Sequence, residues 1–181
     1  HFLYIARWLY GEISAVQALL GYQVKRGPRP DGQDYEQADD SAILTLEFEN
    51  GAQGVIHVSA MCYEGTSFGQ THHMEFHGSK GTLYSFTDWD SVQTVSGTRD
   101  GEGPVKELPI PDHIWGKARR DTVHNTYRDV FREEDFMTRA FITAIQEGTP
   151  ARPTFREGAR IQQIIEAMQR SAETGCRVVL D

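Results

Sequence analysis

The sequence predicts an α+β fold in which a predominantly antiparallel, open-faced β-sheet carries helices packed on one face. Between residues 41 and 86, apolar and polar side chains alternate in paired runs, as they do in half-buried antiparallel strands. From about residue 130 onward, apolar side chains recur with the 3.6-residue period of helices. Strands and helices do not alternate along the chain, which argues against a dinucleotide-binding fold. We therefore expect a sheet of at least five strands.

The first residues, HFLYIARW (1–8), have the apolar character of a buried helix that ends at Gly11. Arg7 is its only charge, so we expect most of the helix circumference to be buried. No Ser, Thr, Asp or Asn precedes it as an N-terminal cap. Residues 13–23 indicate a strand, and residues 25–40, rich in Pro, Gly and Asp, indicate a loop.

Residues 41–60 give the clearest local pattern, two alternating runs on either side of Asn50-Gly51. The Asn-Gly pair accepts the positive φ angles of a tight hairpin turn. In the first run, one face carries Leu44, Leu46 and Phe48, and the other carries Ile43, Thr45 and Glu47.

A second hairpin is expected over residues 72–86, with Gly78 and Gly81 on either side of its turn. Residues 91–95 and 105–110 indicate short further strands. Residues 97–129 contain Pro104, Pro109 and Pro111 and are expected to be irregular, without a long element.

Two helices are expected to close the chain, at residues 133–147 and 155–174, before a last short strand at 176–180. Acidic residues occupy the first turn of the earlier helix, where the helix dipole favours negative charge. Thr154 and Glu157 have the spacing of a capping box at the start of the later helix. The two apolar stripes are Met137, Ala140, Phe141, Ala144 and Ile145, and then Ile161, Ile164, Ile165, Met168 and Ala172.

The length of 181 residues suits a single domain, 1–181, that needs no disulfide or metal to be stable. A net charge of −8 and a pI near 5.3 argue against nucleic-acid and membrane partners. No apolar run approaches the ~18 residues that span a membrane. Cys62 and Cys176 are interpreted as reduced cysteines of a cytoplasmic protein, the alternative being that they pair or bind metal.

Motifs for several chemistries are absent, including GxGxxG, a phosphate-binding loop, GxSxG, HExxH and a zinc ladder. His73, Glu75 and His77 share one face of a predicted strand, where residues two apart can ligate one metal ion. The alternative is a polar or interfacial sheet face with hydrogen-bonded histidines. A metal-dependent enzyme using these three residues is therefore one hypothesis, although no further ligand is indicated.

Four stretches together resemble the C-terminal domain of the Gfo/Idh/MocA family of NAD(P)-dependent oxidoreductases. HFLYIARWLYGE resembles the family's H-x-x-D-x-x-x-W-L-x-G segment, and MEFHGSKGTL resembles its E-x-x-G-x-x-G-x-L hairpin. The closing region from Phe136 to Leu180 resembles the family's two C-terminal helices. The central hairpin resembles that of the family at Phe48, Asn50, Gly51, Gly54 and Ile56.

The resemblance implies that a Rossmann domain precedes His1 in the parent protein and binds NAD or NADP. This chain would then be the substrate-binding and oligomerisation domain, inactive alone and binding no cofactor itself. The implied substrate is a sugar, an inositol or a similar polyol. The implied assembly is a homodimer or tetramer that forms through the open sheet face.

His1 matches the family histidine that lies near the reacting carbon and serves as an acid/base with a lysine of the other domain. An imidazole suits this work because it titrates near neutral pH. The alternative is a tag remnant or a frayed terminus. Tyr4 occupies the position of the family's aspartate and is a candidate substrate-binding residue.

Trp115, His124 and Tyr127 lie in the irregular stretch that reaches toward the substrate in the family, and each is a candidate substrate-binding residue. The alternative for each is an aromatic side chain covering the edge of the core. Because Tyr4 departs from the family pattern, a non-catalytic binding or scaffold module of the same fold stays open as a second function.

Overall fold

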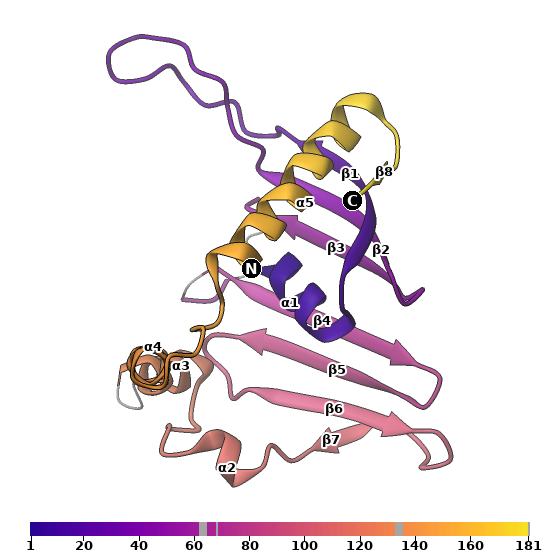
Figure 1. Cartoon of the computed structure of the whole chain (residues 1–181), viewed down its shortest axis with the longest axis vertical. Helices are drawn as coiled ribbons and strands as arrows, with labels where there is room; N and C mark the ends of the chain where they lie inside the picture. Colours follow the sequence, from indigo (N-terminus) through magenta and orange to yellow (C-terminus); the bar gives the residue numbers. More distant parts are fainter. Residues whose placement is uncertain (62–64, 68, 133–135, 181) are drawn as a thin grey trace. The chain divides into compact units, whose positions relative to one another are not determined.

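The computed structural model describes residues 1–61, 65–67, 69–132 and 136–180. It confirms an α+β fold of antiparallel sheets and helices (Figure 1). The chain forms two compact units, one made of His1–Met61 and Arg152–Asp181 and the other of Cys62–Ala151. Each unit is described by itself below, and a single domain over residues 1–181 stays a prediction.

The first unit is built on a four-stranded antiparallel sheet in the order β3, β2, β1, β8. These strands are β1 (Ile13–Gly21), β2 (Ser41–Phe48), β3 (Gln53–Ser59) and β8 (Val178–Val179). The predicted alternation along β2 is confirmed, because Leu44, Leu46 and Phe48 are buried whereas Ile43 and Thr45 are exposed. One face of this sheet therefore belongs to the core and the other is open.

Helix α5 (Phe155–Thr174) packs on β1 and closes the core of the first unit (Figure 1). Its predicted stripe is confirmed, with Ile164 fully buried and Ile161, Ile165 and Met168 partly buried against the core. The capping box is also present, since the Thr154 amide donates to Glu157 Oε2 (2.5 Å) and the Glu157 amide donates to Thr154 Oγ1 (3.4 Å). Gly175 ends the helix in the left-handed conformation.

Helix α1 (Phe2–Tyr10) has one face on this core and the other exposed. Leu3 is buried, and Ala6 and Tyr10 pack against the core. The expectation that most of the helix circumference is buried is wrong, because Trp8 is 76% exposed and Leu9 is exposed as well. A nine-residue helix lying on a sheet offers one side to the core, whatever the composition of its other side.

The hairpin turn between β2 and β3 spans Glu49, Asn50 and Gly51. The Gly51 amide donates to Phe48 O, the Phe48 amide donates to Ala52 O, and Gly51 adopts φ +85°. The Asn50 side chain accepts from the Ala52 amide and donates to Tyr10 O, which ends α1 (2.9 Å). The predicted Asn-Gly turn therefore also fixes the end of the first helix.

The expected loop at residues 25–40 is confirmed and projects beyond the sheet of the first unit (Figure 1). Its base is held by the buried Asp40 carboxylate, which accepts from the amides of Gln23 and Val24. These backbone donors lower the pKa of Asp40.

The second unit contains another antiparallel sheet, in the order β4, β5, β6, β7. The strands are β4 (Thr71–Gly78), β5 (Gly81–Asp88), β6 (Thr94–Arg99) and β7 (Lys106–Leu108). Gly78 pairs with Gly81 around the predicted turn. The expectation of one sheet with at least five strands is wrong, since the described strands form two sheets of four.

Three helices follow the second sheet: α2 (Asp112–Trp115), α3 (Val123–Arg132) and α4 (Phe136–Glu147). The expectation that residues 97–129 lack a long element is wrong, because α3 begins inside that stretch. Residues 133–135, the expected acidic first turn of the next helix, lie outside the described residues, as does Cys62. The α4 stripe is mostly exposed, with only Ala144 of it buried, and α4 chiefly contacts α3. Its packing on a sheet face stays a prediction.

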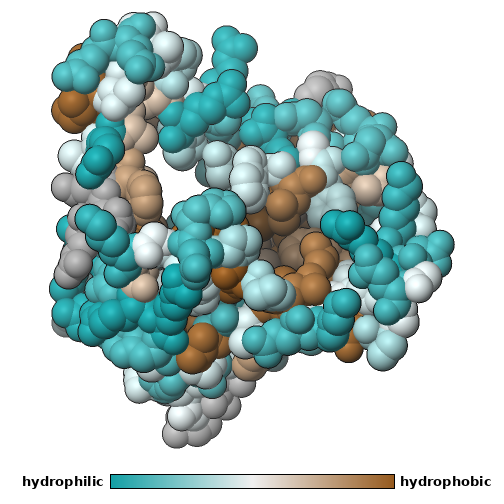
Figure 2. Space-filling model, turned by 90° about the horizontal axis from the view of Figure 1, so that it is seen from below, coloured by the Kyte–Doolittle hydropathy of each residue, from teal (hydrophilic) through white to brown (hydrophobic). Residues whose placement is uncertain are grey.

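The surface seen in Figure 2 is mainly hydrophilic, but hydrophobic side chains also reach it. Within the described ranges, no helix is both long enough and apolar enough to cross a membrane. The most exposed of the large apolar side chains are Trp8, Leu19, Val55, Ile114, Met137, Ile145, Phe155 and Val179.

Ser171 joins the C-terminal end of α5 to β1 and is fully buried. Its Oγ accepts from the Ala18 amide (3.0 Å) and donates to Cys176 O (2.7 Å). We predict that Ser171→Ala lowers the free energy of unfolding by about 1–3 kcal/mol, because it leaves a buried amide without its acceptor. Urea unfolding of the chain measures this, with the exposed Ser79→Ala as control. Equal stability of the two variants would contradict the prediction.

Candidate functional site

His1 and Tyr4, the predicted acid/base and its neighbour, lie at the N-terminal end of α1. His1 occupies the N-cap position, where its carbonyl accepts from the Ile5 amide (3.0 Å) and its side chain makes no capping bond. Tyr4 is half-buried, and its spacing of three residues places it on the same side of the helix as His1. The exposed imidazole and the phenol are therefore neighbours at one end of the first unit.

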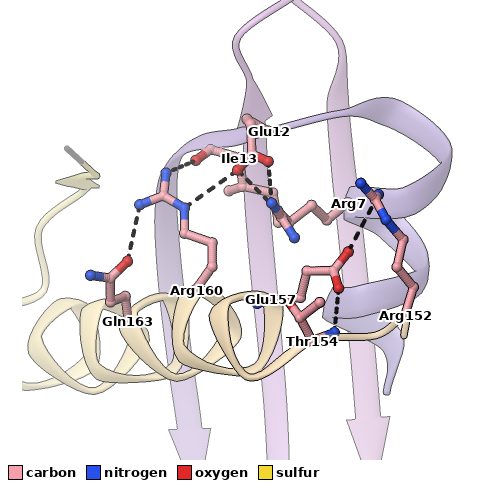
Figure 3. A network of polar contacts seen from close by, with 8 residues as sticks. All are labelled: Arg7, Glu12, Ile13, Arg152, Thr154, Glu157, Arg160 and Gln163. Carbon is pink, nitrogen blue, oxygen red and sulfur yellow. Dashed lines mark hydrogen bonds and ion pairs between the residues drawn. The ribbon is translucent and has the colours of Figure 1, made fainter. Parts of the chain in front are cut away.

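The other end of α1 is held by an ion pair between Arg7 and Glu12 (Figure 3). Arg7 Nε donates to Glu12 Oε2 (2.9 Å), and Arg7 Nη2 donates to Glu12 Oε1, so both guanidinium arms engage both carboxylate oxygens. This two-pronged geometry fixes orientation better than a single contact does. The hydrogen bond to Arg7 lowers the pKa of Glu12 and raises that of the guanidinium.

Arg160 approaches the same carboxylate from α5. Its Nε donates to Glu12 Oε2 (3.4 Å), and its Nη2 donates to Ile13 O at the start of β1 (3.4 Å). Figure 3 shows Glu12 between the two guanidinium groups, with Gln163 supporting Arg160 from one helical turn further along. The three elements α1, β1 and α5 therefore meet at one carboxylate.

Gly11 makes the sharp turn from α1 to β1 with φ +91°, a conformation that a residue with a Cβ adopts only at a cost. Its amide donates to Arg7 O (2.9 Å) and ends the helix. The Tyr10 ring packs on Phe48 with centroids 5.4 Å apart. The Gly11 turn reverses the chain, so that Glu12 comes to lie beside Arg7.

Tyr127 and His124, two of the predicted substrate-binding residues, belong to α3 in the second unit. The Tyr127 ring contacts Trp89 edge to face (centroids 5.4 Å) and Phe131 in a tilted arrangement (4.5 Å), and remains about half exposed. The His124 amide donates to Trp89 O (3.0 Å) at the end of β5. Both residues therefore attach α3 to the second sheet, in partial agreement with the alternative that they cover a core edge.

Trp115 ends the short helix α2 and is partly buried. The Arg120 guanidinium lies over its ring, 5.3 Å from the centroid, and also contacts Asp112 Oδ1 (2.8 Å). The structure groups Trp115, His124 and Tyr127 in the second unit, whereas His1 and Tyr4 belong to the first.

The segment that carries these three residues is stabilised by a buried carboxylate on α3. Asp129 accepts from the Arg119 amide (2.9 Å), from Arg119 Nε (2.8 Å) and from Arg119 Nη2 (2.9 Å). These bonds lower the pKa of Asp129 to about 2. The loop between α2 and α3 is therefore fixed by a charged contact in addition to the burial of Ala118.

His73, Glu75 and His77 are exposed on β4 as the alternation predicts. Glu75 lies between the two rings, 3.6 Å from His73 Nε2 and 3.3 Å from His77 Nε2. Thr82 Oγ1 engages His77 Nδ1 (2.7 Å). Within the described part of the chain, no group of three His, Cys, Asp or Glu side chains is arranged to hold a metal ion. The contacts fit the alternative of a hydrogen-bonded polar face.

An apolar hollow of about 120 Å³ lies where α3 and α4 meet, lined by Val130, Phe131, Phe136, Met137 and Thr138. Among the described residues that line it none is charged, and its volume is smaller than the ~300 Å³ at the lower end of small-molecule sites.

Sequence reasoning missed the residues that hold the predicted ones in place, above all Glu12, Arg160 and Asp129. One signal was available, because Arg7 is a lone charge in an apolar helix and needs a counter-ion nearby. Nothing in the sequence pattern pairs Glu12 with Arg160, which lies 148 residues away.

Residues 1–180 match the model of a family described as "Oxidoreductase family, C-terminal alpha/beta domain". A curated relative, the levoglucosan dehydrogenase of Pseudarthrobacter phenanthrenivorans, is 24% identical over 95% of this chain and 47% of its own length. The chain therefore spans about half the length of this relative.

Two solved structures show the same fold. A levoglucosan dehydrogenase in complex with NADH and L-sorbose has a TM-score of 0.75 at 20% identity, covering 99% of this chain and 48% of that one. An NAD-binding oxidoreductase from Klebsiella pneumoniae has a TM-score of 0.77 at 24% identity, covering 100% of this chain and 48% of that one.

We predict that Asp129 makes stability depend on pH. Its pKa falls from 3.8 to about 2 on folding, so its stabilising contribution is present above pH 3.8 and is lost as the pH falls toward 2. Urea midpoints should differ between the wild type and Asp129→Asn at pH 5, and the difference should shrink as the pH approaches ~2. The exposed Asp100→Asn serves as control. A difference that stays constant across this range would contradict the assignment.

Proposed function

Because the chain belongs to the Gfo/Idh/MocA oxidoreductase family, whose C-terminal α/β domain it matches over residues 1–180, we propose that it is the substrate-binding and oligomerisation domain of an NAD(P)-dependent dehydrogenase. The proposed substrate is a sugar, an inositol or a similar polyol. The observation that carries the proposal is the family match over nearly the whole chain, and we propose His1 as the acid/base.

The substrate class is supported by the relatives. Levoglucosan dehydrogenase is named for an anhydro-sugar, and its structure with NADH also contains L-sorbose. The Bordetella pertussis WlbA dehydrogenase, with a TM-score of 0.58 at 19% identity, covering 100% of this chain and 46% of that one, was solved with NADH and UDP-GlcNAcA. Bound molecules that carry several hydroxyl groups are what these complexes have in common.

The residues of this chain do not fit a dinucleotide. A pyrophosphate is held by a glycine-rich turn from a parallel strand into a helix, and the sequence has no GxGxxG motif. All strand pairs in the described part are antiparallel. We propose that the other half of the parent protein binds the NAD or NADP, and that this chain alone binds neither and is inactive.

In the proposed mechanism, His1 handles the hydroxyl proton of the substrate. Oxidation of a secondary alcohol to a ketone removes one proton from the oxygen and one hydride from the carbon. The nicotinamide supplies the hydride acceptor when it is bound. The His1 imidazole accepts the proton in one direction and returns it in the other.

Tyr4 and the residues of the second unit are proposed to bind the sugar. The Tyr4 hydroxyl can donate a hydrogen bond to a substrate oxygen or to the His1 ring, whereas an ionised aspartate can only accept one. Trp115, His124 and Tyr127 offer aromatic faces and polar edges, which suit a substrate with apolar C–H faces and hydroxyl groups. The half-exposed Tyr127 ring is the most available of the three.

The open face of the first sheet is proposed to form the contact between subunits. The register places Leu19, Ile43 and His57 side by side on this face, and Val55 beside Thr45. Leu19, Ile43, Val55 and Val179 are all exposed there, on the side of the sheet away from α5. An open apolar face of this kind is self-complementary across a two-fold axis and suits a homodimer or tetramer.

A non-catalytic binding or scaffold module is the second candidate function. It is favoured by Tyr4, which stands where the family has an aspartate. The two functions differ in whether the half of the parent protein that precedes this chain carries a catalytic lysine and a GxGxxG turn. Either feature missing from that half would favour the scaffold module.

We predict that His1→Ala in the full-length protein lowers kcat by ~10²–10⁴-fold, the usual effect of removing a positioned acid/base. KM should change much less, because a proton relay acts mainly in the transition state. Steady-state kinetics with NAD or NADP across a panel of sugars and inositols, recorded against pH, measure both constants. The exposed His113→Ala is the matched control. An unchanged kcat in His1→Ala would remove this histidine from the mechanism and favour the scaffold module.

We predict that Leu19→Lys weakens self-association by roughly tenfold or more, because it buries an unpaired charge at the contact. Analytical ultracentrifugation over a concentration series measures the change. Gln162→Lys adds the same charge on the exposed side of α5 and should leave association unaltered. If Leu19→Lys and the wild type have the same assembly state, the open sheet face is not the contact.

A further inference from the structure

The cluster of Arg7, Glu12 and Arg160 has no role in the function proposed above, yet it is the main polar contact among α1, β1 and α5 (Figure 3). All three side chains are partly withdrawn from solvent, with exposures of 20% for Arg7, 37% for Glu12 and 17% for Arg160. One carboxylate therefore serves two guanidinium groups from separate elements. A second carboxylate, that of Glu157, lies at the start of α5. It accepts a hydrogen bond from the Thr154 amide, and its Oε1 lies 3.9 Å from Arg152 Nη1.

Helix α1 depends on such contacts for its direction. Only one of the nine helical residues from Phe2 to Tyr10 is buried, so core packing alone leaves the direction of the helix loosely defined. Leu3 and Ala6 pack against the core, and Arg7, Tyr10 and the Gly11 turn hold its last turn. The buried Leu3 therefore fixes where the helix lies, and the contacts of its last turn fix the direction in which it points.

A small change in the direction of α1 moves the side chains at its start. A side chain reaches roughly 6 Å from the helix axis, so a tilt of about 10° about the buried Leu3 moves the ends of His1 and Tyr4 by about 1 Å. Misplacement of a reacting group by ~1 Å can lower a rate by ~10²-fold. Partly exposed ion pairs contribute little to stability, so the two-pronged geometry has more effect on direction than on folding.

We infer that Arg7, Glu12 and Arg160 are positioning residues, which set the direction of α1 and so place His1 and Tyr4 for the reaction. This inference rests on the proposed function. The Glu12 carboxylate receives Arg7 from α1 and Arg160 from α5, while its own backbone is fixed to the hairpin through the Glu49 amide, which donates to Glu12 O (2.9 Å). Removing its charge leaves two guanidinium groups facing each other, and α1 loses its fixed direction.

A double-mutant cycle in the full-length dehydrogenase tests the inference. Glu12→Gln alone should lower kcat by ~10–100-fold with KM changed less than about threefold, since the acid/base is displaced while the other binding contacts remain. In the His1→Ala background, Glu12→Gln should lower kcat no further, because the group that it positions is already absent. A purely structural role would lower kcat by the same factor in both backgrounds.

Two further variants complete the design. Arg7→Lys keeps the positive charge but loses the planar guanidinium that bonds both carboxylate oxygens of Glu12. It should therefore give a smaller loss of kcat, which also disappears in the His1→Ala background. It supplies the same cycle if Glu12→Gln fails to fold, which circular dichroism detects. Glu166→Gln makes the same substitution on the exposed side of α5 and should leave kcat unchanged.

The outcomes separate this inference from the function on which it rests. A large loss of kcat in His1→Ala together with a normal kcat in Glu12→Gln and Arg7→Lys refutes the positioning role alone. Equal losses in both backgrounds also refute it alone. A normal kcat in His1→Ala refutes the proposed function and the positioning role together.

Discussion

The burial of α5 against β1 is the contact on which the first unit depends. Ile164 and Ala167 are fully buried between the helix and the sheet, beside Val16 and Leu46. The same helix supplies Ser171, whose hydroxyl accepts from a β1 amide at a point where β8 has ended. It also supplies Arg160, which reaches Glu12. The apolar stripe of α5 therefore places two polar side chains where β1 and α1 need them.

Different contacts stabilise the second unit. Its sheet has partly exposed strands on both sides, and its helices expose many apolar side chains. Where the first unit relies on a packed helix, the segment between α2 and α3 relies on Asp129 and its three bonds from Arg119. The aromatic contacts of Tyr127 then attach α3 to the end of β5. A charge-dependent contact is more sensitive to pH than apolar packing is, so the stability of this segment depends on pH through Asp129.

Local patterns in the sequence were sufficient for most of the elements. Period-two runs predicted both hairpins, the Thr154 and Glu157 spacing predicted the cap of α5, and Gly175 marked its end. The helix α3 was missed although Val123, Tyr127, Val130 and Phe131 recur at helical spacing, because the prolines at 104, 109 and 111 break the chain only before this helix begins. The division into two four-stranded sheets was missed because alternation identifies strands without specifying their partners.

The residues of the candidate site likewise fall into those that the sequence predicted and those that it missed. The positions of His1 and Tyr4 followed from a resemblance in one short segment, and such a segment can be identified without knowing the fold. The residues that hold them in place could not be identified in this way, because Arg160 meets Glu12 only after α5 has packed on β1.

The failed expectation about α1 has a physical explanation that bears on function. An apolar helix with a single charge was expected to be buried on nearly all sides, yet only one side is. A helix buried all around could not present His1 and Tyr4 to a substrate. The lone charge that suggested burial, Arg7, is instead the group that ties the helix to Glu12 from its partly covered side. The composition of α1 thus combines a core contact at Leu3, an anchoring contact at Arg7 and an open face.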